Sequence, residues 1–259
     1  MSTEAGAVRL ERHDAVATIT LDRPSARNAL TWAMYEELDK ALDRVGSEPE
    51  VRVVVLRGAG GNFAAGTDIS QFQAFASGDD GVDYERRLES VLTKLESAPA
   101  TTIAAVEGYA AGGGLALATA CDLRVASPNA QFGVPIARTI GNCLSMSNYA
   151  RLVASLGAAR TKTMLLTAEF MSADEARSIG FVMRILEPHA FARELEMLCA
   201  RLVSHAPLTL QVTREAVRRI VSQSAAEGDD LLRRVYGSHD FREGVAAFVE
   251  KRKPRWEGR

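Results

Sequence analysis

The sequence has few cysteines and no excess of charge of one sign, two features that would each point to a particular class of protein. It contains only three cysteines in 259 residues, Cys121, Cys143 and Cys199, which is an odd number at wide spacing. This pattern argues against a disulfide framework and is typical of a reducing compartment. Lysine plus arginine (31) nearly balances aspartate plus glutamate (33), giving a net charge of −2. We therefore expect neither nucleic acid nor an anionic membrane as an electrostatic partner.

Long hydrophobic runs are also absent from the sequence. The most apolar stretch, residues 109–121, is followed at once by Asp122 and Arg124. It is shorter than the roughly 20 apolar residues that cross a bilayer. The first residues lack the basic segment and apolar core of a secretory signal. The sequence therefore predicts a cytoplasmic protein with no membrane partner.

No stretch rich in proline, serine or glycine divides the chain, and no low-complexity segment is present. Hydrophobic residues make up 47% of the sequence, which is enough for a full core. We expect one main body, residues 1–190, followed by a helical region, residues 191–259. No His, Cys, Asp and Glu residues cluster at metal-ligand spacing, so we expect no metal.

Short β-branched segments alternate with helical periodicity through the first two-thirds of the chain. Strands are predicted at 8–12, 16–21, 51–56, 102–106, 123–125 and 181–186, and helices from Thr31, from Asp68, at 83–97, from Leu115, at 145–156 and at 160–167. Ser172 and Glu175 form a capping box, and most of the chain after Pro188 has a helical pattern. This order indicates the α/β class. It does not separate a doubly wound sheet from a β-superhelix.

Two glycine-containing turns carry the chemistry. One spans residues 62–69, Asn-Phe-Ala-Ala-Gly-Thr-Asp-Ile, and the other spans residues 106–115, Val-Glu-Gly-Tyr-Ala-Ala-Gly-Gly-Gly-Leu. Each precedes a predicted helix, so each leaves backbone N–H groups without an intrahelical partner. Two such turns brought together can bind an oxyanion.

These turns resemble those of the enoyl-CoA hydratase/isomerase (crotonase) family. Further segments follow in the family's order: 20–24 (TLDRP), 28–30 (NAL), 121–126 (CDLRVA), 130–133 (AQFG), 172–176 (SADEA) and 247–254 (AFVEKRKP). The resemblance implies an α/β crotonase-like ββα superhelix, or spiral, with a C-terminal helical region that supports a homotrimer or homohexamer. It also implies an acyl-CoA thioester as ligand, with coenzyme A as part of the substrate and no permanently bound cofactor.

The resemblance assigns site residues by position. The backbone N–H groups of Thr67 and Gly113 would hold the thioester oxygen, and the Thr67 side chain would leave its N–H unaffected. Residues that would contact coenzyme A are Arg27, Ala65, Ile69, Phe248 and Lys251.

The chain departs from the family at the two glutamates of its hydratases. Ala116 and Ile136 occupy those positions, and neither can hold or transfer a proton. Both would line the acyl pocket, as would Arg138 and Asn142, which either position a polar acyl group or form a loop ion pair and a turn.

Three other side chains are candidates for the proton transfer or nucleophilic attack that Ala116 and Ile136 cannot perform. Cys143 is near the place where dehalogenases of the family have a nucleophile, but a free cysteine is also a common small filler. Asp68 is an acid–base candidate or the cap of the following helix. Glu107, at a strand end, is a catalytic candidate or a solvated carboxylate.

The resulting hypothesis is an acyl-CoA enzyme that passes through an enolate stabilised by the oxyanion hole. Hydratase or isomerase is the family's commonest activity, while the residues leave the reaction open. The alternatives are a non-catalytic acyl-CoA-binding protein and a CoA-thioester hydrolase or decarboxylase.

Overall fold

The computed structural model describes residues 6–74, 78–139 and 141–222, together with 239, 243, 252, 255 and 257–259. Phe248 and Lys251 lie outside the described residues. The strands are β1 (Ala7–His13), β2 (Val16–Asp22), β3 (Val53–Gly58), β4 (Thr101–Val106), β5 (Tyr109–Ala111), β6 (Leu123–Ala126), β7 (Gln131–Gly133), β8 (Met171–Ser172) and β9 (Arg184–Ile185).

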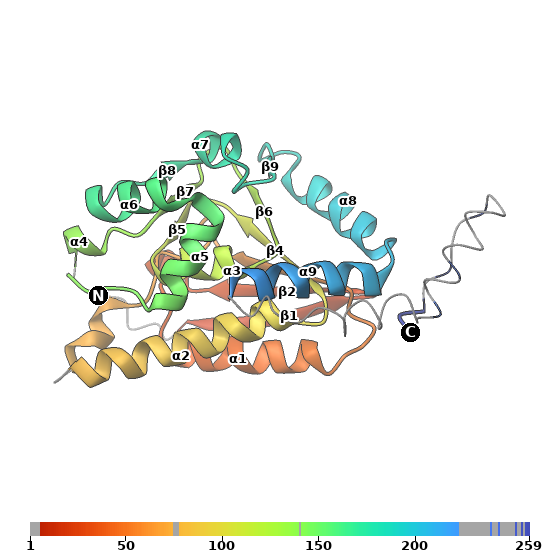
Figure 1. The fold of residues 1–259 in the computed structure, drawn as a ribbon, viewed down its shortest axis with the longest axis horizontal. Coiled ribbons are helices and arrows are strands. Elements are labelled where there is room, and N and C mark those ends of the chain that lie inside the picture. Colours follow the sequence, from red (N-terminus) through yellow and green to blue (C-terminus); the bar gives the residue numbers. More distant parts are fainter. Residues whose placement is uncertain are drawn as a thin grey trace.

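Helices connect and cover these strands (Figure 1). The α-helices are α1 (Trp32–Gly46), α2 (Gly78–Ser97), α3 (Gly113–Ala120), α4 (Ile136–Thr139), α5 (Met146–Leu156), α6 (Ala158–Thr167), α7 (Ala173–Ser178), α8 (Phe191–Val203) and α9 (Pro207–Val221), and the 3₁₀ helices are η1 (Pro24–Ala26) and η2 (Ile69–Ala74). None of the helices in the described ranges is long and apolar enough to cross a bilayer.

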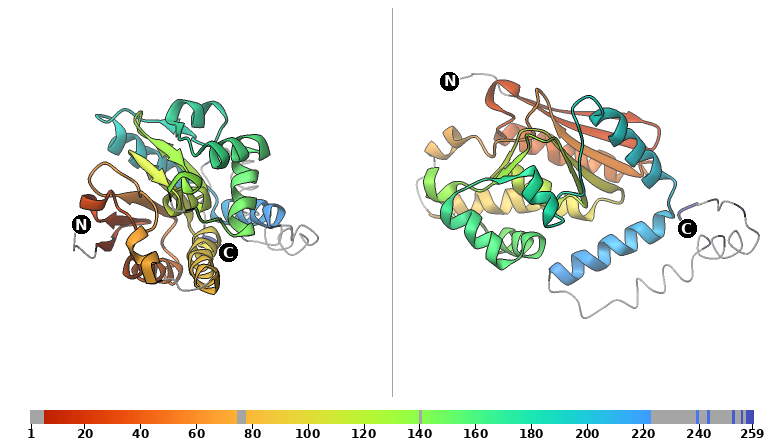
Figure 2. Two further views of the ribbon diagram at one scale, coloured as in Figure 1. Left: turned by 90° about the vertical axis from the view of Figure 1, so that its left-hand side faces the viewer. Right: turned by 90° about the horizontal axis from the view of Figure 1, so that it is seen from above.

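The larger sheet has six strands in the order β1-β2-β3-β4-β6-β9. Only β1 and β2 pair antiparallel; the other neighbours are parallel. Its central strands are buried on both faces, as their unbroken apolar sequences require. In β3, Val53 and Val55 pack in the core that includes α8, whereas Val54 and Leu56 pack in the core that includes α1, α2 and α3. The sheet therefore lies between two helical layers (Figures 1 and 2).

A second, smaller sheet runs β5-β7-β8. Single parallel bridges, Leu30 with Thr67 and Ala64 with Ala110, continue its pattern into two earlier loops. Apart from β8, which follows α6, each of these short segments follows a strand of the large sheet and precedes a helix. The chain thus repeats a ββα turn, which confirms the spiral fold expected from the resemblance.

The helical C-terminal segment is tied to the spiral by a charged cluster. Arg214 on α9 donates to Asp122 Oδ2 at 2.6 Å and to the Ala98 carbonyl at 2.8 Å. The same Asp122 oxygen accepts hydrogen bonds from the backbone N–H and the hydroxyl of Thr102. Asp122 therefore joins the start of β4 to α9.

Several helix starts differ from the sequence prediction. A helix was expected from Asp68, but the chain forms the 3₁₀ helix η2 there, and α2 begins at Gly78, five residues before the helix predicted at 83–97. Asp68 Oδ1 accepts hydrogen bonds from the Ser70 N–H and hydroxyl, which closes a local turn. Helix α3 begins at Gly113, two residues before the predicted start, directly after the positive φ of 49° at Gly112.

Candidate active site

The two glycine turns meet at the edge of the small sheet. The carbonyl of Gly66 accepts the Leu30 N–H at 2.8 Å, and the Asp68 N–H donates to the Leu30 carbonyl at 2.9 Å, so the Thr67 N–H between them faces away from this pairing. Gly113 is the first residue of α3, where an N–H has no intrahelical partner. Within the described residues neither the Thr67 nor the Gly113 N–H donates to the protein backbone.

The geometry brings these two N–H groups close together. A Cβ built on Gly113 would lie 3.7 Å from the Thr67 nitrogen and 3.1 Å from the Thr67 hydroxyl oxygen. Gly66 and Gly112 have positive φ values of 107° and 49°, which glycine adopts without strain. Two unpaired backbone donors held side by side by glycine turns are the geometry of an oxyanion hole.

A chain of three hydroxyl groups lies against this site. The Thr67 hydroxyl is 2.7 Å from the Tyr35 hydroxyl and 2.9 Å from the Tyr84 hydroxyl. The Tyr35 oxygen would lie 2.6 Å from a Cβ on Gly113. Burial is the largest cause of a raised pKa for both tyrosines, so both keep their protons at neutral pH. The chain therefore links α1 and α2 to the oxyanion turn.

The hydroxyl chain changes what is expected of substitutions at Thr67. Thr67→Val keeps the shape and the backbone N–H, but it removes the hydrogen bonds of the Thr67 hydroxyl with the Tyr35 and Tyr84 hydroxyls. We expect a loss of about 1–3 kcal/mol in the free energy of unfolding, measured by denaturant titration. Thr67→Ser keeps the hydroxyl and should cost about 0.8 kcal/mol for the lost methyl. Equal losses in the two variants would show that the hydroxyl chain contributes nothing to stability.

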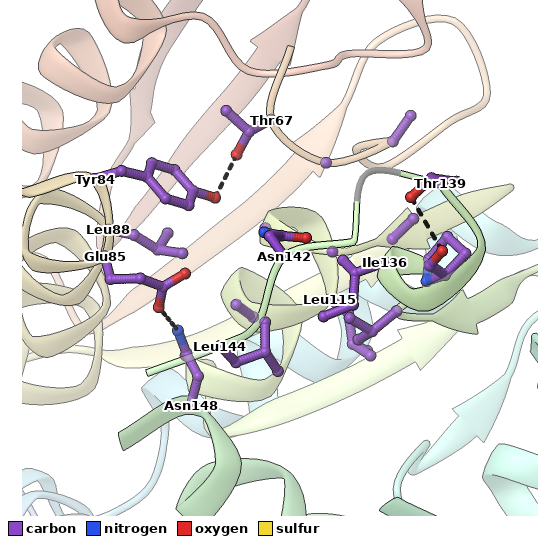
Figure 3. A pocket seen from close by; sticks show the side chains of 18 of the residues that line it. Thr67, Tyr84, Glu85, Leu88, Leu115, Ile136, Thr139, Asn142, Leu144 and Asn148 are labelled. Carbon is purple, nitrogen blue, oxygen red and sulfur yellow. Dashed lines mark hydrogen bonds between the residues drawn. The ribbon is translucent and has the colours of Figure 1, made fainter. Parts of the chain in front are cut away.

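The turns open onto a cavity of about 170 Å³. Its walls come from both turns, α2, α3, α4, the segment after α4 and the start of α5 (Figure 3). Of the residues expected at the site, those that line it are Ala65, Thr67, Ile69, Gly113, Ala116, Ile136 and Asn142. Leu88, Leu115 and Leu144 make much of the remaining wall apolar. An acyl group would meet hydrocarbon on most sides.

Four candidates from the sequence do not line this cavity: Arg138, Cys143, Asp68 and Glu107. Asp68 pairs with Arg23 at 2.7 Å. Burial alone would raise the Asp68 pKa, but hydrogen bonds from Ser70 and Arg23 outweigh it and the pKa is lowered. Cys143 is an exposed free thiol. Catalysis by Asp68, Cys143 or Glu107 stays a prediction, although none of the three lines the cavity.

Arg27 lies outside the cavity, on the outer side of the first turn. Its carbonyl accepts the Ala65 N–H at 2.9 Å, and its guanidinium stacks over the Tyr109 ring at 5.2 Å. The side chain is exposed. This placement, next to Ala65, suits a cation that meets a phosphate of a ligand entering between the turns.

The polar side of the cavity was not recognised in the sequence. Glu85 Oε2 accepts hydrogen bonds from the Ser145 N–H at 2.7 Å and the Asn148 side-chain amide at 3.4 Å (Figure 3). Arg151, also in the wall, pairs with Glu89 at 2.6 Å and with Glu96 at 2.7 Å. The periodicity of 83–97 showed a helix but not which of its charges turn inward.

Comparison with known proteins agrees with the architecture and the turns. The model of a family described as enoyl-CoA hydratase/isomerase matches residues 11–259. The short-chain-enoyl-CoA hydratase of Clostridium acetobutylicum is 32% identical over 255 residues, covering 96% of this chain and 97% of that protein. A probable enoyl-CoA hydratase of Rhizobium meliloti is 36% identical, with the same coverage of both chains. A crystal structure of an enoyl-CoA hydratase/carnithine racemase from Magnetospirillum magneticum superposes with a TM-score of 0.91 at 32% identity, covering 100% of this chain and 97% of the other.

Proposed function

The chain belongs to the enoyl-CoA hydratase/isomerase family, and we propose that it binds an acyl-CoA thioester with the carbonyl oxygen between the N–H groups of Thr67 and Gly113. The observation that carries this proposal is the pair of unpartnered backbone donors at the mouth of an apolar cavity. The acyl group enters the cavity, and the coenzyme A part lies toward Ala65, Ile69 and the Arg27 cation. Phe248 and Lys251, outside the described residues, stay candidates for coenzyme A contacts.

The chemistry that such a site performs is enolate formation. Removing a proton next to a thioester carbonyl, or adding to a conjugated double bond, places negative charge on the carbonyl oxygen. Two pre-aligned N–H groups stabilise that charge, and each is worth roughly 3–4 kcal/mol in comparable sites. The proposed activity is therefore acyl-CoA chemistry through an enolate, as expected for a lyase or isomerase of the family.

The alternatives differ in the fate of the bound thioester. A non-catalytic acyl-CoA-binding protein would bind and release the thioester unchanged. A hydrolase or decarboxylase would release free coenzyme A or carbon dioxide. The apolar Ala116 and Ile136 in the cavity wall count against ordinary hydration. A C-terminal region that assembles a trimer or a hexamer is a further part of the proposal.

Binding of acyl-CoA is the first test. Titration calorimetry with butyryl-CoA and octanoyl-CoA should show saturable binding, while butyrate and octanoate should bind poorly because they lack the coenzyme A handle. Arg27→Ala should weaken binding of both thioesters, and Arg44→Ala, a change on α1 near its C-terminal end, is a matched control. Absence of heat with both thioesters, in a sample shown to be folded, would overturn the proposed ligand.

A further inference from the structure

Among the described residues that line the cavity, Glu85 on α2 supplies the only carboxylate. By the family resemblance, Ala116 and Ile136 stand where hydratases of the family carry glutamates, and both are apolar. We propose that Glu85 is the general base of this site and removes a proton from the carbon next to the thioester carbonyl. This inference rests on the proposed acyl-CoA function and names the residue that performs its proton transfer.

The Glu85 carboxylate is held in one orientation. Its Oε2 atom accepts the Ser145 N–H at 2.7 Å and the Asn148 amide at 3.4 Å. Ser145 is itself the N-cap of α5, where its hydroxyl accepts the Asn148 N–H. These contacts occupy one oxygen and leave Oε1 available to receive a proton. Supporting hydrogen bonds of this kind are what a catalytic carboxylate needs to keep its rotamer.

Helix α2 links the oxyanion turn to the part of the cavity wall that holds Glu85. The preceding residue, Tyr84, reaches the Thr67 hydroxyl at 2.9 Å and so fixes the position of α2 relative to that turn. In Figure 3 the side chains of Tyr84 and Glu85 both project from α2 into the cavity, across from Asn142. Tyr84 acts as a positioning residue, and Glu85 faces the space that an acyl chain would fill.

The ionisable groups near Glu85 are protonated or already paired, so Glu85 is the candidate base of this cavity. On α2 and α1 its titratable neighbours are Tyr84 and Tyr35, both with pKa values raised chiefly by burial and so protonated. On α5 its charged neighbour is Arg151, whose guanidinium nitrogens are engaged by two other glutamates at 2.6–2.9 Å, namely Glu89 and Glu96.

The proposed step balances without a further reactant. Glu85 Oε1 forms a bond to the α-hydrogen as the C–H bond breaks. The C–H electron pair becomes the carbon–carbon double bond of the enolate, and the carbonyl π pair moves to the oxygen held by Thr67 and Gly113. When the proton on Glu85 is replaced by one from solvent before it returns to the α-carbon, the result is exchange with solvent. Delivery of the proton to the γ-carbon of an unsaturated chain gives double-bond isomerisation.

The test measures binding and proton transfer separately. Wild type and Glu85→Gln are incubated with butyryl-CoA and 3-hexenoyl-CoA in D₂O, and mass spectrometry follows deuterium uptake at the α-carbon. We expect uptake in the wild type and a loss of ~10²–10⁴-fold in Glu85→Gln, with calorimetric affinity for butyryl-CoA unchanged within about threefold. The matched control is Asp83→Asn on the same helix, whose side chain is 68% exposed and outside the cavity. It should exchange at the wild-type rate.

Each outcome bears on one of the two proposals. Wild-type exchange in Glu85→Gln, or butyryl-CoA binding without any exchange in the wild type, overturns Glu85 as the base and leaves the binding proposal standing. No binding by the wild type overturns the proposed ligand, and this inference falls with it. If Glu85→Gln fails to fold, Glu85→Asp decides. A moved carboxylate should lower the exchange rate, and an unchanged rate would overturn the proposal.

Discussion

Gly113→Val should abolish turnover of any acyl-CoA while leaving the protein folded. A Cβ at Gly113 would lie 3.1 Å from the Thr67 hydroxyl, 3.7 Å from the Thr67 nitrogen and 2.6 Å from the Tyr35 hydroxyl. The valine side chain would therefore clash with the Tyr35 and Thr67 hydroxyls and displace the turn that carries the Thr67 N–H. Losing one oxyanion donor costs about 10²–10³-fold in kcat, and we expect at least that loss in deuterium uptake or product formation.

The effect at Gly113 is steric and not a consequence of backbone strain. The positive φ of this turn belongs to Gly112, at 49°, whereas Gly113 already has helical geometry. Gly46→Ala, at the end of α1 with nothing within 4 Å of the new Cβ, is the matched control and should keep full activity. An active Gly113→Val variant would show that the carbonyl oxygen lies elsewhere, and the oxyanion assignment would fail.

Much of the fold could be predicted from the sequence because most elements have a local sequence pattern. The run at 51–56 is largely apolar, and most of it becomes β3, which is buried on both faces. Ser172 caps α7 by accepting the Glu175 N–H at 3.2 Å, as the capping box predicts. The family's spiral topology came from the resemblance, since the same alternation of strands and helices also suits a doubly wound sheet. The bridge between Ala64 and Ala110 distinguishes the two.

Only part of the candidate site could be predicted from the sequence. The backbone donors follow from glycine turns, which are visible in the sequence. Tyr35, Tyr84 and Glu85 were not, because their roles depend on how α1 and α2 are rotated about their axes and on contacts with residues up to 63 positions away. The ion pair of Asp68 could not be predicted for a similar reason. Its partner Arg23 is 45 residues away, and only the fold shows that this carboxylate is engaged in an ion pair.

Hydration of crotonyl-CoA should be slow compared with ordinary hydratases of the family. The reaction needs one group to orient and deprotonate water and another to protonate the α-carbon. Ala116 and Ile136, which the resemblance assigns to the positions of these groups, lie in the cavity wall and supply neither. Each missing acid–base group costs ~10²–10⁴-fold, and Glu85 can replace at most one of them. The measurement is the decay of absorbance at the conjugated enoyl band, normalised to bound substrate.

Restoring the glutamates separates missing groups from a reshaped cavity. Ala116→Glu adds a carboxylate to the α3 wall, and Ile136→Glu adds one at the start of α4, so the double variant supplies both groups within the same 170 Å³ cavity. We expect only a small rise in hydration, because the larger side chain at position 116 takes up part of the cavity that must also hold the acyl group and a water molecule. Ala116→Gln with Ile136→Gln, which adds the same bulk without charge, should show no rise. Fast hydration by the wild type would contradict this account, and its loss in Glu85→Gln would then identify Glu85 as the group that has taken over the water.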